Sequence, residues 1–139
     1  MKITQPTKTS DVIRQWQLID AKDQIIGHVA SEIANLLMGK SKGYYAKNID
    51  CGDNVVVINS ALIKSTGKKE DQKMYRKHSG FPGGFKEISL KNLRIKNSNV
   101  IVTHAVSGMV PDNKLKKKIM ARLFVYKDAN HRHQAKFNK

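Results

Sequence analysis

The hydrophobic and polar positions in the first half of the chain predict two strands with a helix between them. Residues 16–20 (WQLID) have the apolar, β-favouring composition of a short strand. Residues 25–40 repeat apolar side chains every three or four positions, and Gly39 is placed to end a helix. Residues 53–60 hold a run of β-branched side chains between turn-forming residues, which is typical of a strand buried on both faces. The order strand, helix, strand indicates a βαβ unit.

The second half of the chain is more polar, and its pattern is less regular. Residues 64–86 are polar, basic and rich in turn residues, so we expect a loop there. Residues 86–95 favour a short helix, whereas residues 99–111 begin with a β-branched run that favours a strand. Three Leu or Ile side chains at four-residue steps predict a basic helix over 113–126. Residues 127–139 have no periodicity and are expected to form a basic tail.

Length and the lack of an internal linker or repeat predict one domain over residues 1–139, with an N-terminal arm at 1–14. The only cysteine is Cys51, which excludes an intramolecular disulfide and a cysteine-built zinc site and fits a reducing compartment. No apolar run approaches the roughly 20 residues of a membrane span. The first residues also lack the apolar segment of a signal peptide. We therefore expect a cytoplasmic protein with no membrane partner.

The net charge of the chain indicates a polyanionic partner, which the pattern of apolar residues does not. Lys and Arg number 26 against 11 acidic residues, a formal net charge of +15. Residues 111–139 hold nine Lys or Arg against two acidic residues, and residues 64–78 hold six against two. Solubility needs a net charge of only about 2–8 in a small domain. The excess favours nucleic acid as the partner, with most affinity coming from phosphate contacts.

The segment KHSGFPGG (77–84) is the candidate phosphate-binding loop. It lacks the Lys-Ser/Thr that follows the glycines of a nucleotide-binding loop, and it lacks the spacing of a dinucleotide fingerprint. Its glycines are explained by a turn that needs positive φ, and they also let a backbone approach a phosphate. Side-chain donors lie next to these glycines: Lys77, His78, Ser79 and Lys86. Three aromatic rings also lie nearby, and they could stack on bases or pack in a core: Tyr75, Phe81 and Phe85.

Catalytic and metal-binding patterns are weak in this sequence. The Asp and His residues form no recognisable triad or carboxylate pair, so we expect no enzyme, no cofactor and no small-molecule substrate. His131 and His133 lie two residues apart and could chelate a metal, but Arg132 between them disfavours a cation and no third ligand is evident. We expect a hydrogen-bonding basic tail and no metal site. The basic helix over 113–126 favours packing on a sheet over insertion into a membrane surface, because its apolar face is narrow.

A collinear set of motifs resembles the bacterial form of the ribosomal protein L13 family of the large subunit. The motifs are WxLIDA (16–21), IGHVASEIAxLLxGK (26–40), DCGDxVVVIN (50–59), TGKK (66–69), KMYRKHSGFPGG (73–84), VSGMVP (106–111), LFVY (123–126) and NHRH (130–133). Together they cover nearly the whole chain, and their order makes the resemblance specific. Four residues depart from the family's usual pattern: His28, Ser107, Lys116 and Asp128.

The resemblance implies a three-layer α/β/α domain with a central, mainly parallel four-stranded sheet, basic loops and a C-terminal tail. It also implies a non-catalytic structural constituent of the large ribosomal subunit that binds large-subunit ribosomal RNA, contacts neighbouring ribosomal proteins and helps early assembly. An organellar ribosome remains an alternative location to the cytoplasm. The expected RNA-binding residues come from the loops at 40–47 and 64–86, a turn at 108–111, the 113–126 helix and the tail. They are Lys40, Lys42, Lys47, Lys68, Lys69, Lys73, Tyr75, Arg76, Lys77, His78, Ser79, Gly80, Gly83, Gly84, Lys86, Gly108, Met109, Lys114, Lys116, Lys117, Lys118, Arg122, His131, Arg132 and His133.

Two other classes of function stay open from the residues alone. One is a sequence-neutral nucleic-acid-binding protein, since charge by itself does not separate RNA from DNA. The other is an enzyme that acts on a phosphorylated substrate through the glycine-rich segment. Competition by duplex DNA addresses the first alternative, and nucleotide titration addresses the second.

Overall fold

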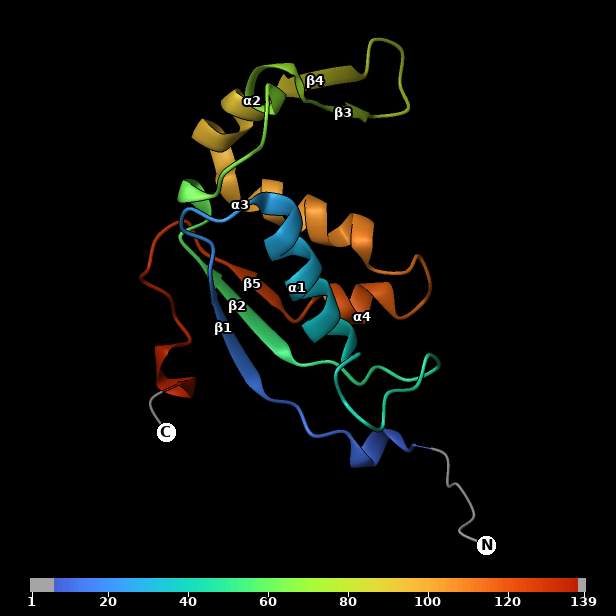
Figure 1. Cartoon of the computed structure of the whole chain (residues 1–139). Helices are drawn as coiled ribbons and strands as arrows, with labels where there is room; N and C mark the ends of the chain where they lie inside the picture. Colours follow the sequence, from blue (N-terminus) through green and yellow to red (C-terminus); the bar gives the residue numbers. More distant parts are fainter. Residues whose placement is uncertain (1–6, 138–139) are drawn as a thin grey trace, which may run out of the picture.

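The computed structural model describes residues 7–137 of the chain. Residues 1–6 of the expected N-terminal arm and residues 138–139 of the expected tail lie outside the described residues. Helices pack on a parallel sheet, and a separate antiparallel pair of strands projects from this body (Figure 1). The α/β class expected from the sequence is therefore confirmed. No helix within residues 7–137 is long and apolar enough to cross a membrane.

The parallel sheet consists of β1 (Trp16–Asp20), β2 (Asn54–Ile58) and β5 (Leu123–Val125), in the order β1-β2-β5. The strands predicted at 16–20 and 53–60 are confirmed, and the valines of the central strand β2 are fully buried. Both pairings are parallel, so β2 exchanges hydrogen bonds on both of its edges. Within the described residues the sheet has three strands, not the expected four.

Helix α1 (Ile26–Met38) connects β1 to β2 and confirms the predicted helix. Its buried face is made of alanine and larger apolar residues at helical spacing. Gly39 ends the helix in the left-handed conformation at φ 73°, and its amide donates to the carbonyls of Asn35 and Leu36. A Cβ on Gly39 would lie 2.6 Å from the Cys51 carbonyl oxygen, so close packing against the segment before β2 also requires glycine.

The strand predicted at the start of 99–111 is wrong, because this segment forms part of helix α3 (Leu90–Met109). The β-branched run is buried at Ile101, Val102 and Val106, a helical spacing that faces the core of the molecule. Asn97 interrupts the helix with φ −160° and ψ 92°, and its side-chain oxygen accepts a hydrogen bond from the Asn99 amide. Burial of one helical face therefore overrides the β propensity of the run.

The helix predicted over 113–126 is also shorter than expected. Helix α4 spans Lys116–Met120, and the chain then turns and enters β5. Ile119 is buried as the helical pattern predicts. Leu123, however, pairs with Val55 across the open edge of β2. Residues 123–125 (LFV) form a strand because an unpaired edge of the buried strand β2 would leave backbone groups without hydrogen bonds.

The expected loop at 64–86 contains a short helix and most of a hairpin, and the expected helix at 86–95 is confirmed only from Leu90 onward, because residues 86–89 belong to a strand. Helix α2 (Lys69–Gln72) precedes β3 (Met74–His78), which pairs in antiparallel fashion with β4 (Phe85–Ser89). Helix α3 then starts at Leu90, where the Ser89 hydroxyl accepts a hydrogen bond from the Asn92 amide and caps the helix. The hairpin escapes prediction because most of its side chains are exposed, which leaves no alternating apolar pattern.

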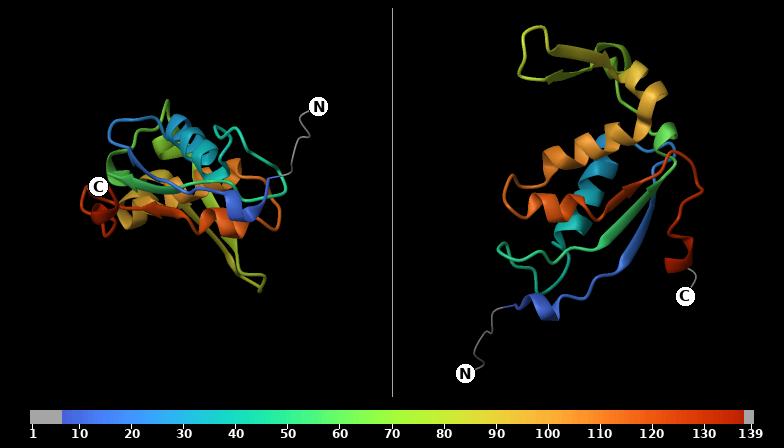
Figure 2. Two further views of the ribbon diagram at one scale, coloured as in Figure 1. Left: turned by 90° about the horizontal axis from the view of Figure 1, so that it is seen from below. Right: turned by 180° about the vertical axis from the view of Figure 1, so that it is seen from behind.

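The two faces of the parallel sheet are covered differently. Ile19, Val55 and Val57 pack with buried side chains of α1, α3 and α4 in one core. Side chains alternate along a strand, so Val56 and Phe124 belong to the opposite face. Figures 1 and 2 show the helices on one side of the sheet and the C-terminal tail on the other. The expected three-layer arrangement is therefore corrected: the third layer is an irregular tail, because that segment has no helical apolar stripe.

Candidate nucleic-acid interface

The β3–β4 hairpin carries the highest concentration of exposed candidate residues. It stands away from the sheet in all three views (Figures 1 and 2). Lys77 and Lys86 occupy directly opposite positions in its ladder, and both are exposed. The neighbouring pair, Arg76 and Glu87, forms an exposed ion pair of 3.4 Å. Two like charges placed opposite each other destabilise an antiparallel pair of strands. Lys77 and Lys86 therefore do not stabilise the hairpin by pairing with each other.

The turn of this hairpin uses its own backbone donors internally. The Ser79 amide donates to the Gly84 carbonyl at 3.2 Å, and the Gly84 amide donates to the Phe81 carbonyl at 2.9 Å. The Gly80 amide donates to Nδ1 of His78 at 2.9 Å. Three amides of the predicted phosphate loop are therefore already occupied, and the exposed Lys77 and Lys86 side chains are among the groups free to meet a phosphate.

The glycines of the turn are required by its geometry. Gly83 has φ +71°, in the left-handed region that favours glycine. A Cβ on Gly84 would lie 2.0 Å from Oγ of Ser79 and 2.8 Å from the Phe81 carbonyl oxygen. The positive-φ explanation is therefore confirmed for Gly80, at φ +84°, and Gly83, whereas Gly84 is required by close packing instead. Phe81 remains 74 % exposed at the tip and Phe85 55 % exposed beside it, so neither ring belongs to the core.

The hairpin is held to the body through a small second core. Ile88 and Tyr75, which are paired across the strands, pack against buried side chains of α3. The ring of His104 meets the Tyr75 ring edge-on at a centroid distance of 5.2 Å. Burial raises the pKa of the Tyr75 phenol. The predicted base-stacking role of Tyr75 therefore competes with packing contacts that already occupy its ring.

Arg94 fixes α2 to α3 and was missed by the sequence reasoning. Its guanidinium donates to both carboxylate oxygens of Glu70, at 2.8 and 3.0 Å, and also to the carbonyls of Ala61 and Ile63. The hydrogen bonds from Arg94 and from the Ser65 hydroxyl hold the pKa of Glu70 below its ordinary value. No motif signals this pair, because its members are 24 residues apart in the chain.

A second group of exposed lysines lies around α4. The segments 45–50 and 111–119 line one small hollow together, which brings Lys47 close to the start of α4. Lys114, Lys117 and Lys118 are exposed there, while Lys116 contacts Asp112 at 3.3 Å. We call Lys47, Lys114, Lys117 and Lys118 the α4 cluster. It collects charges from two segments that the sequence analysis had treated as separate basic regions.

Two predicted RNA-binding residues are engaged inside the protein. Lys42 contacts the carboxylate of the buried Asp53 and donates to the Ile13 carbonyl, and its side chain is only 14 % exposed. Arg122 forms a two-pronged ion pair with Asp50 and is 11 % exposed. Both side chains join segments that are distant in the chain. The RNA contact predicted for these two residues therefore competes with ion pairs that hold the fold together.

The tail brings its predicted residues to the face of the sheet opposite the helices. The ring of His133 lies 4.9 Å from Trp16 and 4.4 Å from Phe124, centroid to centroid. The ring of His131 lies 5.7 Å from that of Tyr126. Both imidazoles are half-buried, whereas Arg132 between them is exposed. Within residues 7–137 no group of three or more His, Cys, Asp or Glu side chains is arranged to hold a metal ion.

The remaining predicted residues are accessible but dispersed. Gly108 and Met109 are the last residues of α3, not a turn, and both are exposed. Lys40 is exposed immediately after the end of α1. The predicted residues with exposed side chains or backbone are Lys40, Lys47, Lys68, Lys69, Lys73, Arg76, Lys77, His78, Ser79, Gly80, Gly83, Lys86, Gly108, Met109, Lys114, Lys117, Lys118 and Arg132.

Comparison of the sequence with known proteins identifies one family over most of the chain. The family model described as "Ribosomal protein L13" matches residues 14–132. A large ribosomal subunit protein uL13 from Dehalococcoides mccartyi is 48% identical over 130 residues, covering 94% of this chain and 91% of that protein. Proteins of the same name from Clostridioides difficile and Geobacter sulfurreducens are 47% and 44% identical, covering 92% and 97% of this chain and 90% and 94% of those proteins. The chain belongs to the ribosomal protein L13 family.

Proposed function

We propose that this protein is a structural constituent of the large ribosomal subunit that binds large-subunit ribosomal RNA and helps it fold during early assembly. Family membership supports this function and supports a non-enzymatic role. The net charge of +15 supports a partner rich in phosphate. The proposal includes one domain over residues 1–139, cytoplasmic ribosomes as its location, and contacts with neighbouring ribosomal proteins.

The single observation that carries the RNA contact is the opposition of Lys77 and Lys86 on the projecting hairpin. Two exposed ammonium groups on facing ladder positions repel each other in the free protein. A phosphate group between or beside them removes that repulsion. The hairpin is thus better suited to the bound state than to the free state.

The other exposed basic residues extend the proposed contact over several sides of the molecule. The hairpin, the segment around α2 with Lys68, Lys69 and Lys73, and the α4 cluster carry separate groups of lysines on a body that is held together by its sheet and helices. Such a distribution suits several RNA segments that converge on one protein, because each group neutralises a different part of the backbone. Recognition then depends on the shape of the folded RNA and on phosphate and 2′-hydroxyl contacts, not on base sequence.

A charge-matched pair of variants tests the proposal. Lys77→Ala/Lys86→Ala removes two charges from the hairpin, and Lys8→Ala/Lys22→Ala removes two exposed charges elsewhere. Binding to purified large-subunit rRNA is measured over a range of salt concentrations. We expect the hairpin variant to bind about tenfold more weakly and to reduce the salt slope by about 2, because each phosphate-binding lysine contributes about 1. The control variant should keep both values.

The outcomes separate the parts of the proposal. Equal affinities and salt slopes for the two variants would overturn the role of the hairpin. Equal competition by duplex DNA and by rRNA at fixed salt would favour a sequence-neutral nucleic-acid-binding protein instead. Micromolar, stoichiometric binding of a free nucleotide would favour the phosphate-substrate alternative. Incorporation of each variant into large subunits, measured by sedimentation at high salt, tests the role in assembly.

A further inference from the structure

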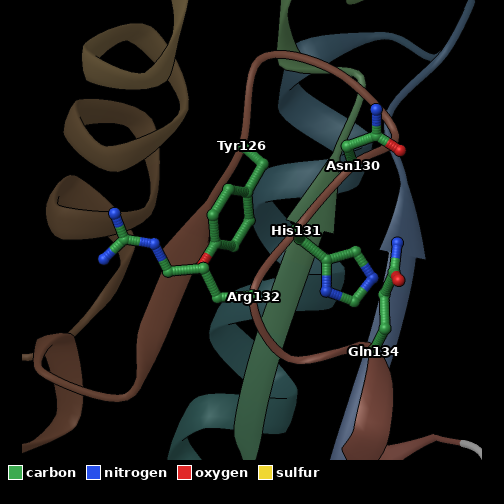
Figure 3. Close-up of a pocket in the computed structure, with 5 residues that line it drawn as sticks. All are labelled: Tyr126, Asn130, His131, Arg132 and Gln134. Carbon is green, nitrogen blue, oxygen red and sulfur yellow. The ribbon is translucent and has the colours of Figure 1, made fainter.

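A hollow on the described surface lies at the tail and is not used by the proposed phosphate contacts. It has a volume of about 530 Å³ and is lined by Tyr126, Asn130, His131, Arg132 and Gln134 (Figure 3). Ligand sites in proteins typically have volumes of about 300–1,000 Å³. The hollow is therefore large enough for one nucleotide, although it is open to solvent.

The side chains that line the hollow have complementary chemistry. Tyr126 and His131 provide rings, and Asn130 and Gln134 provide amides that can each donate and accept hydrogen bonds. Arg132 provides a cation, and no carboxylate lines the hollow. In the view of Figure 3, Arg132 lies on one side of the Tyr126 ring, while His131 and Gln134 lie on the other. Rings, amides and a guanidinium are the groups with which proteins hold unstacked bases and their phosphates.

The two amides are available for a ligand. Asn130 and Gln134 are exposed, and within residues 7–137 neither side chain makes a hydrogen bond to another residue. Nδ1 of His131 accepts a hydrogen bond from the His133 amide at 3.2 Å. Nε2 is consequently the His131 nitrogen left to meet a ligand. The two amides and Nε2 of His131 make no hydrogen bond within the described residues that would explain why they lie together.

The wall of the hollow is fixed by the sheet behind it. The Tyr126 amide donates to the Val57 carbonyl at 2.8 Å, and the Tyr126 carbonyl accepts from the Ser60 amide at 3.1 Å. The Tyr126 ring lies 5.7 Å from His131 and 6.2 Å from His133, which itself stacks against Trp16. A ring held in this way can receive a base with little further loss of conformational freedom.

We propose that this hollow binds a single unpaired nucleotide of the RNA, with its base against the Tyr126 and His131 rings. The amides of Asn130 and Gln134 bond the edge of the base, and Arg132 contacts the phosphate. The inference deepens the RNA-binding function proposed above and rests on it. It adds base-dependent recognition of one nucleotide to a protein whose other contacts are with the backbone.

Three RNA hairpins of one sequence test this inference with the full-length chain. The first is fully paired, the second carries one bulged adenosine, and the third carries an abasic residue at the bulge. Affinities are measured at one salt concentration. We expect wild-type protein to bind the bulged RNA about tenfold more tightly than the paired and abasic RNAs, since stacking of one base has an effect of this size.

Two double variants complete the design. Asn130→Ala/Gln134→Ala should reduce the preference for the bulge, because the hydrogen bonds to the base edge are lost while the stacking rings stay, and should keep its affinity for paired RNA. Asn48→Ala/Asn92→Ala, which removes two exposed amides elsewhere, should keep the preference. Circular dichroism verifies that both variants fold.

The results distinguish failure of this inference from failure of the proposed function. Equal binding of all three RNAs by wild-type protein would overturn the nucleotide site and leave the RNA-binding function standing. Equal binding of the bulged and abasic RNAs, both tighter than the paired RNA, would show recognition of a bent backbone and would also overturn the site. Binding of none of the RNAs at low salt would count against the RNA-binding function itself.

Discussion

Arg122 donates from Nη1 and Nη2 to the two carboxylate oxygens of Asp50, which precedes it by 72 residues. Nη2 also donates to the Leu37 carbonyl at 3.0 Å, near the end of α1. Both charged side chains are nearly buried, at 11 % and 12 % exposure. One guanidinium therefore connects the start of β5 to the loop before β2 and to α1, so an RNA contact of Arg122 would compete with these bonds.

Replacing Arg122 by alanine should destabilise the fold without acting directly on RNA binding. We expect Arg122→Ala to lower the free energy of unfolding by about 3 kcal/mol, because three charge-assisted hydrogen bonds are lost and Asp50 is left with the longer ion pair to Arg14, at 3.5 Å. Urea denaturation measures this change, and Lys117→Ala, an exposed charge removal, is the control with an expected effect below about 0.5 kcal/mol. A loss of stability no larger than that of the control would contradict the structural assignment.

The ion pair between Arg94 and Glu70 should make stability depend on pH. The folded-state pKa of Glu70 lies below the ordinary glutamate value of 4.5, so the pair stabilises the fold above that pH. The contribution is lost as the pH falls from 4.5 through the folded-state pKa. We expect Glu70→Gln to be about 1 kcal/mol less stable than wild type at pH 7, a small value because the Glu70 side chain is 35 % exposed.

Urea unfolding of wild type and Glu70→Gln at pH 7 and at pH 3 measures this effect. The difference in unfolding free energy should shrink at the lower pH. Asp71→Asn, at the exposed neighbouring position, serves as the control. A difference between wild type and Glu70→Gln that stays constant across this range would count against the proposed role of the Glu70 carboxylate.

Gly84→Ala should disturb the hairpin turn while the core stays folded. The added Cβ would lie 2.0 Å from Oγ of Ser79, so the turn must open or the Ser79 side chain must move. We expect weaker rRNA binding and an unchanged thermal midpoint, because the turn lies outside both hydrophobic cores. Gly27→Ala, where a Cβ meets nothing within 4 Å, should keep wild-type binding. Wild-type binding by Gly84→Ala would show that the turn geometry is not needed.

His133→Ala should be detected by the single tryptophan. Trp16 stacks on Phe124 and lies 4.9 Å from His133, so the tail shields its indole from water. We expect the emission maximum of Trp16 to shift to longer wavelength in His133→Ala, as water reaches the ring. Arg132→Ala removes an exposed side chain from the same segment and should leave the emission unchanged. Identical spectra for wild type and His133→Ala would contradict docking of the tail on the sheet.

The candidate interface could be predicted from the sequence only as a set of charges. Charge density selects the hairpin and α4 regions as candidates, and most of their lysines are exposed. It cannot distinguish Lys117, which faces solvent, from Lys42 and Arg122, which neutralise Asp53 and Asp50. That distinction depends on which carboxylate lies within a few ångströms, and the partners come from other segments of the chain.

The pattern of neighbouring residues predicted the βαβ start of the fold and the end of α1 at Gly39, the collinear motifs indicated the family, and the total charge favoured a polyanionic partner. Each of these depends on residues close together in the chain or on total charge. Three other features became visible in the folded molecule alone: residues 99–109 are helical, Leu123 pairs in a strand, and Tyr126 and His131 line a common hollow with the amides of the tail. The local preferences of a segment for helix or strand differ by less than the free energy gained by burying a helix face or pairing a sheet edge. Burial and pairing depend on residues that are far apart in the sequence, so they cannot be read from the segment itself.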